Sequence, residues 1–128
     1  MLFRSEDRDV PKPTALILSY PVVTMTQRTH SGSRDRLIGK EPNPALMDRL
    51  CVEKHITRVY PSTYVWNGTA DDLVDPVNSR LLEEALEKAG VSHLHEEYQG
   101  VGHGVGLAKG TAAEPWFGHA ITFWEEQA

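Results

Sequence analysis

Two loops of the chain carry side chains that could move protons. The first follows the strand-like run Thr63 to Trp66 and contains Asp71 with Asp72 beside it. The second is the glycine-rich segment Gly100 to Gly106, which holds His103 at its centre. A carboxylate beside a histidine fixes the tautomer of the imidazole and stabilises the imidazolium that forms when it takes a proton. Acid before histidine is the order of the last two members of a Ser–Asp–His triad, so we predict that Asp71 and His103 form an acid–base pair.

Asp72 competes with Asp71 for the role of the acid. We favour Asp71, because the third residue after Gly68 in such a turn projects toward the histidine loop. Asp75 is assigned instead to capping the helix that follows, with Pro76 at its first position. The plainer alternative is that both loops are only turns, with the acids capping one and the histidine standing in the other.

A metal site is a further alternative. His93 and His95 alternate along a strand and therefore share a face, and Asp71, Asp72 and His103 could complete a ligand set. No metal-ligand spacing recurs elsewhere, so we expect neither a metal nor a cofactor. The glycines of the histidine loop do not form a dinucleotide-binding fingerprint, because their spacing is wrong and a histidine interrupts them.

Strands and helices alternate around these loops. Strands are expected at Thr14 to Val23, where a continuous apolar run predicts burial on both faces, and at Pro61 to Asn67. A more polar third strand, Val91 to Gln99, is expected at a sheet edge. Helices are expected from Pro76 to Gly90 and from about Pro115 to Glu126. This order predicts an α/β fold with a mostly parallel sheet and crossover helices.

Two helical details can be tested against the structure. In the last helix we expect a capping box at its start, from Thr111 to Glu114, and one apolar side. The residues expected on that side are Phe117, Ala120, Ile121 and Trp124. Between the first two strands, about residues 24 to 60 are expected to form a cap-like insertion, in which Asn43-Pro44 begins a helix.

Composition narrows the class of protein. The 128 residues suffice for one domain, with residues 1–13 as an exposed lead-in, and the net charge of -5 without a basic cluster argues against a nucleic-acid partner. No apolar run reaches membrane-spanning length, and the charged start does not resemble a signal peptide, so we expect a cytoplasmic protein. The single cysteine, Cys51, lies between apolar residues and is expected to be a reduced core residue.

The motifs together resemble the C-terminal half of an α/β-hydrolase, and within that fold the small acetylxylan-esterase-like esterases that act on sugar esters. The matching residues are Ala15 to Val23, Gly32-Ser33, Leu37 to Gly39, Glu53 to Thr57, Gly68 to Asp72, Val74, Pro76, Asn78, Ser79 and Gly102 to Leu107. This resemblance covers residues 14–128. It implies that Asp71 is the triad acid, that His103 is the general base, and that the inserted segment covers the acyl site.

The nucleophile of such an enzyme is missing from this sequence. It contains neither Gly-x-Ser-x-Gly nor a His-Gly-Gly oxyanion loop, and Ser19, Ser31 and Ser33 do not stand in elbow contexts. We therefore expect a hydrolase of acetyl or short acyl esters, possibly of sugars, that carries only the acid and base half. The alternative is a non-catalytic remnant or interaction module. A homo-oligomer or a complementing N-terminal fragment would cover the exposed edge of the Thr14 to Val23 strand.

Overall fold

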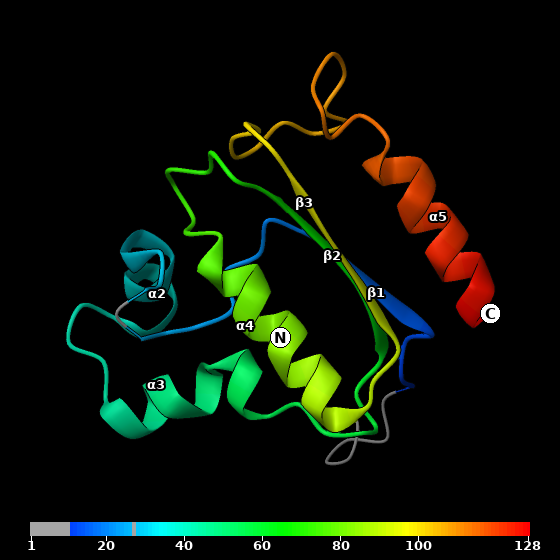
Figure 1. Ribbon diagram of the computed structural model, residues 1–128. Helices are drawn as coiled ribbons and strands as arrows, with labels where there is room; N and C mark the ends of the chain where they lie inside the picture. Colours follow the sequence, from blue (N-terminus) through cyan, green and yellow to red (C-terminus); the bar gives the residue numbers. More distant parts are fainter. Residues whose placement is uncertain (1–10, 27) are drawn as a thin grey trace.

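The computed structural model describes residues 11–26 and 28–128, which form a three-stranded parallel sheet with helices on both faces (Figure 1). The strand order is β1 (Ala15–Ser19), β2 (Ser62–Gly68) and β3 (His93–Tyr98), and β2 pairs with both neighbours in parallel. Helical segments connect the strands, so the predicted α/β class with crossover units is confirmed. Of the expected lead-in, the first ten residues lie outside the described part of the chain.

Helices cover the two faces of the sheet unequally. On one side lie α2 (Ser31–Ile38), α3 (Pro44–Leu50), the short 3-10 helix η1 (Val52–Lys54) and α4 (Val77–Ala89), and on the other side lies α5 (Trp116–Gln127) (Figure 1). Alternation along β2 supplies both cores. Val65 faces the cluster that contains Leu82 and Leu86, while Tyr64 and Trp66 face the cluster around α5. After Ser62, the residues of β2 are buried because neighbours cover both of its faces and both of its edges.

Strand β1 is shorter and more exposed than its apolar sequence predicts. It spans five residues, and within the described part of the chain it is an edge strand with one neighbour. The expected burial on both faces is wrong, since Ile17 is 43% exposed. Pairing stops at Pro21, which has no N–H, after Tyr20 has already turned the chain with a φ of 39°.

Most helix ends follow the predicted capping chemistry. The Asn43 side chain accepts a hydrogen bond from the Ala45 N–H at 2.8 Å, and Asp75 Oδ1 accepts one from the Val77 N–H at 2.9 Å. Gly90 ends α4 in the left-handed conformation, with a φ of 68°. Helix α2 begins at Ser31, where the ring of His30 accepts a hydrogen bond from the Ser33 N–H and caps the helix.

The apolar side predicted for α5 is wrong. The helix buries Trp116, Ala120 and Phe123, whereas three of the four residues expected there are between 39% and 49% exposed. Those three residues are Phe117, Ile121 and Trp124. Apolar residues lie on two sides of this helix. The side that carries Trp116 and Phe123 is buried because these two large rings pack against Trp66 and Tyr64.

The start of α5 also differs from the expected capping box. The Thr111 hydroxyl accepts from the Ala113 N–H, and Glu114 reaches the Gly110 N–H, so the helix begins only at Trp116. A polar contact then fastens the helix to the sheet. The Tyr64 hydroxyl donates to Glu96 at 2.7 Å, and the ring of His119 lies 2.9 Å from the same carboxylate. Burial, followed by the bond to Glu96, raises the pKa of Tyr64.

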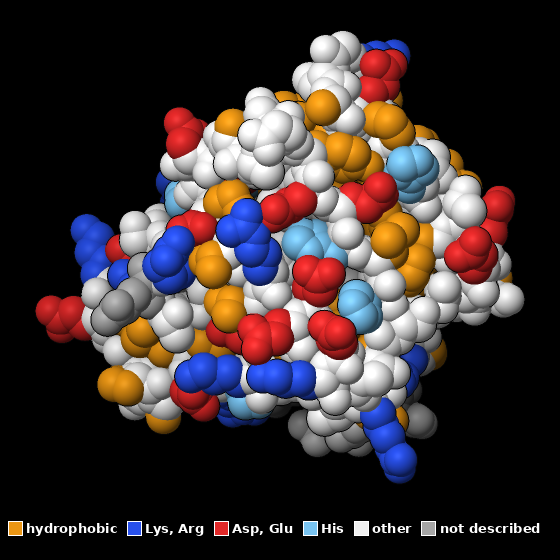
Figure 2. Space-filling model, viewed as in Figure 1, with side chains coloured by type: hydrophobic (Ala, Val, Ile, Leu, Met, Phe, Trp, Pro, Cys, Tyr) orange, Lys and Arg blue, Asp and Glu red, His pale blue; other side chains and the backbone are white. Residues whose placement is uncertain are grey.

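Two further observations concern the surface and the cysteine. The face in Figure 2 carries both acidic and basic side chains. The ion pairs of the structure include Arg80 with Glu97, at 2.7 Å. None of the helices in residues 11–26 and 28–128 combines the length and the apolar character that crossing a membrane requires. Cys51 is fully buried and its thiol is free, as expected for a reduced core residue. Its sulfur accepts a hydrogen bond from the Met25 N–H.

Candidate active site

The loops after β2 and β3 leave the same edge of the sheet and are bonded to each other. The Thr69 N–H donates to the Tyr98 carbonyl at 3.0 Å, and the Ala70 N–H donates to the Val101 carbonyl at 3.1 Å. In return, the Gly100 N–H donates to the Thr69 hydroxyl at 2.9 Å. These bonds hold the acid loop and the histidine loop in one fixed relation, which neither loop could maintain alone.

Gly68 makes this close approach feasible. A Cβ on Gly68 would lie 1.9 Å from the carbonyl oxygen of Val101, which is far inside van der Waals contact. The residue ends β2 and is already buried. Only a residue without a side chain therefore lets the backbone of the histidine loop pass over the end of β2.

Asp71 uses its two carboxylate oxygens for different partners. Oδ1 accepts hydrogen bonds from the Leu73 N–H at 3.0 Å and the Val74 N–H at 2.9 Å, and these bonds hold the turn. Oδ2 lies 2.8 Å from Nδ1 of His103. The expected hydrogen-bond contact of this pair is confirmed. Asp72, the competing acid, is exposed beside it.

His103 presents its second nitrogen outward. With Nδ1 donating to Asp71, Nε2 is left as the proton acceptor, and it has no hydrogen-bond partner within residues 11–26 and 28–128. The side chain is 24% exposed, while that of Asp71 is 1% exposed. A buried carboxylate behind a half-open imidazole is an arrangement that can take a proton from a hydroxyl group placed at Nε2.

Sequence reasoning missed an aromatic partner of His103. The ring of Tyr20, directly after β1, lies 4.4 Å from the imidazole between ring centres. The sequence places this residue only within the apolar run Thr14 to Val23. The one signal in the sequence is its place at the end of a strand neighbouring β2, because the carboxyl ends of parallel strands meet at one edge.

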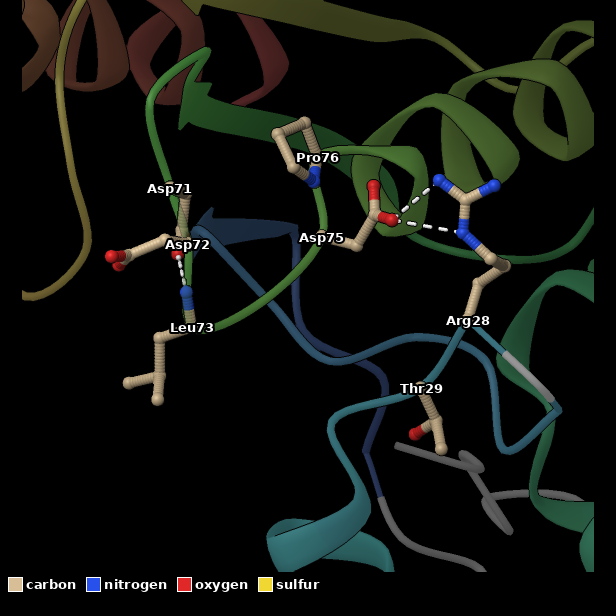
Figure 3. Close-up of a pocket in the computed structure, with 7 residues that line it drawn as sticks. All are labelled: Arg28, Thr29, Asp71, Asp72, Leu73, Asp75 and Pro76. Atoms are coloured by element: carbon tan, nitrogen blue, oxygen red, sulfur yellow. Dashed lines mark hydrogen bonds and ion pairs between the residues drawn. The ribbon is translucent and has the colours of Figure 1, made fainter.

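Beyond Asp71 the surface is hollowed into a polar pocket of about 390 Å³. Its walls are formed by Arg28, Thr29, Asp71, Asp72, Leu73, Asp75 and Pro76 (Figure 3). The Arg28 guanidinium donates to Asp75, with its Nε at 2.9 Å, and so ties the loop after β1 to the start of α4. The Val77 N–H, and then the Arg28 guanidinium, hold the pKa of Asp75 below its usual range.

Asn78 organises the same region from inside, a role that its place in the sequence did not reveal. Its side chain is fully buried, and its Oδ1 accepts from the Val23 N–H at 2.9 Å and the Thr24 N–H at 3.1 Å. Its amide donates to the Arg28 carbonyl at 3.2 Å. The first turn of α4 therefore fixes the chain that leaves β1, and with it part of the pocket wall.

The histidines of the metal alternative have other partners. His93 Nδ1 lies 2.8 Å from the Val91 carbonyl, and His95 stands between Glu83 and Asn67, each at 2.7 Å. Among the described residues, no group of three or more His, Cys, Asp or Glu side chains is placed to hold a metal ion. The structure thus does not bring His93 and His95 together with the Asp71 and His103 pair.

The serines also have defined places. Ser19 Oγ, at the end of β1, accepts a hydrogen bond from Nε1 of Trp66 at 2.8 Å. Ser33 Oγ lies 2.8 Å from Nδ1 of His30, within the cap of α2, and Ser31 begins that helix. None of the three bonds to His103.

Solved structures with a similar fold are known. The structure superposes on the acetyl ester-xyloside bifunctional hydrolase from Caldicellulosiruptor lactoaceticus with a TM-score of 0.86 and 30% sequence identity, over 89% of this chain and 42% of that one. The chain has a partial α/β-hydrolase fold. It resembles the C-terminal half of such a protein, and among α/β-hydrolases it is similar to the acetylxylan-esterase-like and carboxylesterase members, as expected.

A second solved structure shares the fold, and one curated protein is similar in sequence. The carboxylesterase Cest-2923 from Lactobacillus plantarum matches with a TM-score of 0.76 at 24% identity, over 94% of this chain and 47% of that one. In sequence the chain is 29% identical to endo-1,4-beta-xylanase B from Butyrivibrio fibrisolvens over 107 residues, which is 84% of this chain and 17% of that protein. No protein-family model matches. The chain spans less than half of the solved structures named here.

Proposed function

We propose that the chain supplies the general base and the orienting acid of a serine-type carboxylic-ester hydrolase. The observation that carries this proposal is the 2.8 Å contact between Asp71 Oδ2 and His103 Nδ1, with Nε2 left for a reacting hydroxyl. The esterase names of the structural neighbours support the same reaction class.

Each residue has a step in the proposed reaction. His103 Nε2 takes the proton of a serine hydroxyl as its oxygen attacks the ester carbonyl, and it returns that proton to the leaving alkoxide. Asp71 holds the imidazole in the required tautomer and stabilises the imidazolium. Water then attacks the acyl-enzyme with His103 as base again, and this chemistry requires no cofactor. The serine must come from a Gly-x-Ser-x-Gly elbow, which the 128 residues do not contain.

The proposed substrates are acetyl or short acyl esters, with sugar esters as the favoured class. The support is the similarity to a protein described as an acetyl ester-xyloside hydrolase, and the sequence match to a xylanase. The competing proposal is a non-catalytic interaction module that retains the acid and base loops.

The two proposals can be distinguished by combining the chain with a fragment that supplies the missing nucleophile. The 128-residue chain alone is expected to show no turnover of an aryl acetate above background and no labelling by a fluorophosphonate, because it lacks both the elbow serine and the oxyanion loop. A fragment that carries these two parts and a matching strand edge is expected to restore turnover. In that complex His103→Ala should abolish turnover, while His93→Ala, a change on β3 at a histidine bonded to a backbone carbonyl, should leave it nearly unchanged.

Two results would contradict the proposal. Turnover that survives His103→Ala in the reconstituted complex would remove the assigned base. Ester hydrolysis by the chain alone, blocked by a fluorophosphonate, would point to a nucleophile within these residues. Ser33→Ala would then test the serine that bonds to His30.

A further inference from the structure

Tyr20 holds a backbone conformation that its residue type does not favour. Its φ of 39° is positive, a region that non-glycine residues enter rarely and with backbone strain. The Tyr20 N–H donates to the Trp66 carbonyl at 2.7 Å, which fixes the turn at the end of β1. Such strain persists only where surrounding contacts impose it, and it gathers at functional sites.

The turn places the Tyr20 ring against the imidazole of His103. The two ring centres are 4.4 Å apart with planes tilted by 57°, and the ring also meets Trp66 edge-on at 5.1 Å. Trp66 is fully buried, stacks on Trp116 at 5.1 Å, and donates its indole N–H to Ser19. The Tyr20 ring is therefore backed by the rigid aromatic core between β2 and α5.

A single hydrogen bond does not fix the orientation of an imidazole ring. The bond from Nδ1 to Asp71 restrains the position of the ring, but the ring can still rotate about that bond. The residues on either side, Gly102 and Gly104, have no side chains to limit the rotation. Tyr20 supplies the ring contact that His103 makes within the described residues.

We propose that Tyr20 is a positioning residue for His103, whose ring wedges the imidazole into the plane in which Nδ1 meets Asp71 and Nε2 faces the reacting hydroxyl. The role in catalysis rests on the proposed function, whereas the positioning is a property of the chain itself. The Tyr20 hydroxyl forms no hydrogen bond with the described residues, so the ring carries the effect.

Three substitutions separate ring, hydroxyl and backbone. Tyr20→Phe keeps the ring and removes the hydroxyl. Tyr20→Gly and Tyr20→Asn remove the ring but tolerate a positive φ, so the turn is preserved, and two such variants guard against the failure of one to fold. Circular dichroism and thermal unfolding verify the fold. Tyr60→Leu, a tyrosine packed in the cluster on the opposite face of the sheet, is the matched control.

The readout is proton NMR of the 128-residue chain. Wild type, Tyr20→Phe and Tyr60→Leu are all expected to show a slowly exchanging Nδ1–H signal of His103 and nuclear Overhauser contacts from its ring to residue 20. Tyr20→Gly and Tyr20→Asn are expected to exchange this proton at least tenfold faster. Unchanged exchange in both ring-free variants, or equal loss in Tyr20→Phe, would overturn the proposal.

Kinetics in the reconstituted complex give an independent check. Loss of the ring should lower kcat by about tenfold to a hundredfold, because small misplacements of a catalytic group cost that much, with KM little changed. If His103→Ala leaves turnover intact, the proposed function fails, but the NMR result still decides the role of Tyr20. Wild-type kcat in both ring-free variants would overturn the catalytic part of the inference.

Discussion

At the scale of single residues, Asp71 combines a structural and a chemical task in one carboxylate. Its Oδ1 holds two backbone N–H groups of its own turn, and its Oδ2 holds His103. A substitution that removes Oδ1 therefore affects the stability of the turn, whereas one that alters Oδ2 affects the contact with His103. A change that keeps Oδ1 and alters Oδ2 tests the chemistry without dismantling the loop.

Asp71→Ala and Asp71→Asn are therefore expected to differ. The alanine variant leaves two N–H groups without their acceptor and should lower the free energy of unfolding by about 1–3 kcal/mol. The asparagine variant retains an acceptor at Oδ1 and should lose much less stability, yet in the reconstituted complex it should lower kcat by about 10⁴, because the imidazole is held in the wrong tautomer. Urea unfolding and steady-state kinetics measure the two effects. The exposed neighbour provides the control, since Asp72→Asn should change neither quantity, and equal stability losses in the two Asp71 variants would contradict the division of tasks.

The Asp71 and His103 pair could be predicted because its signals are local. Each residue follows a strand, in a turn rich in glycine, and parallel strands deliver their ends to one edge. Tyr20 could not be predicted in the same way. Its contact depends on a positive φ, and nothing about a tyrosine before a proline announces that conformation.

At the scale of elements, the end of β2 and the loop after β3 form one unit whose spacing Gly68 sets. Gly68→Ala would drive a methyl group into the Val101 carbonyl, so the two loops must separate. We expect a loss of about 1–3 kcal/mol or more in the free energy of unfolding, together with loss of the His103 Nδ1–H signal. Gly102→Ala in the same loop is the matched control, since a Cβ there meets no atom within 4 Å. A Gly68→Ala variant as stable as Gly102→Ala would refute this account of the spacing.

Helix and strand ends were predictable to within a few residues, since capping residues and glycines mark them, as Asn43 and Gly90 show. The buried side of α5 was not, because apolar residues surround most of that helix and the aromatic partners on β2 decide between the sides. The exposure of β1 was also missed, since an apolar strand reads as buried whether or not a second neighbour is present.

At the scale of the whole molecule, the feature that bears on association is the edge of β1, which has no partner strand among residues 11–26 and 28–128. A half-buried apolar strand with free N–H and carbonyl groups along one side is a template for another chain. We propose that the chain forms dimers or larger oligomers through this edge, and that Ile17→Lys weakens them by placing a charge there. Sedimentation velocity over a range of concentrations measures the change. Leu94→Lys is the matched control on the opposite edge strand, where Leu94 is similarly exposed at 40%.

The alternatives give different results in the same experiment. A wild-type chain that remains monomeric at high concentration would contradict the proposed association. Weakening by Leu94→Lys but not by Ile17→Lys would assign the contact to the β3 edge instead.

The central position of β2 has a consequence for the order of folding. The first pair of β2 with β3, Thr63 with His93, closes a shorter loop than the first pair with β1, Ala15 with Ser62, and α4 forms inside that shorter loop. Because loop closure costs entropy that rises with length, the unit of β2, α4 and β3 should assemble first and β1 should dock last. The acid and histidine loops belong to the early unit, while Tyr20 arrives with β1. Pulsed hydrogen exchange during refolding should therefore protect Val65 before Leu18, and the imidazole should gain its aromatic neighbour only in the final step of folding.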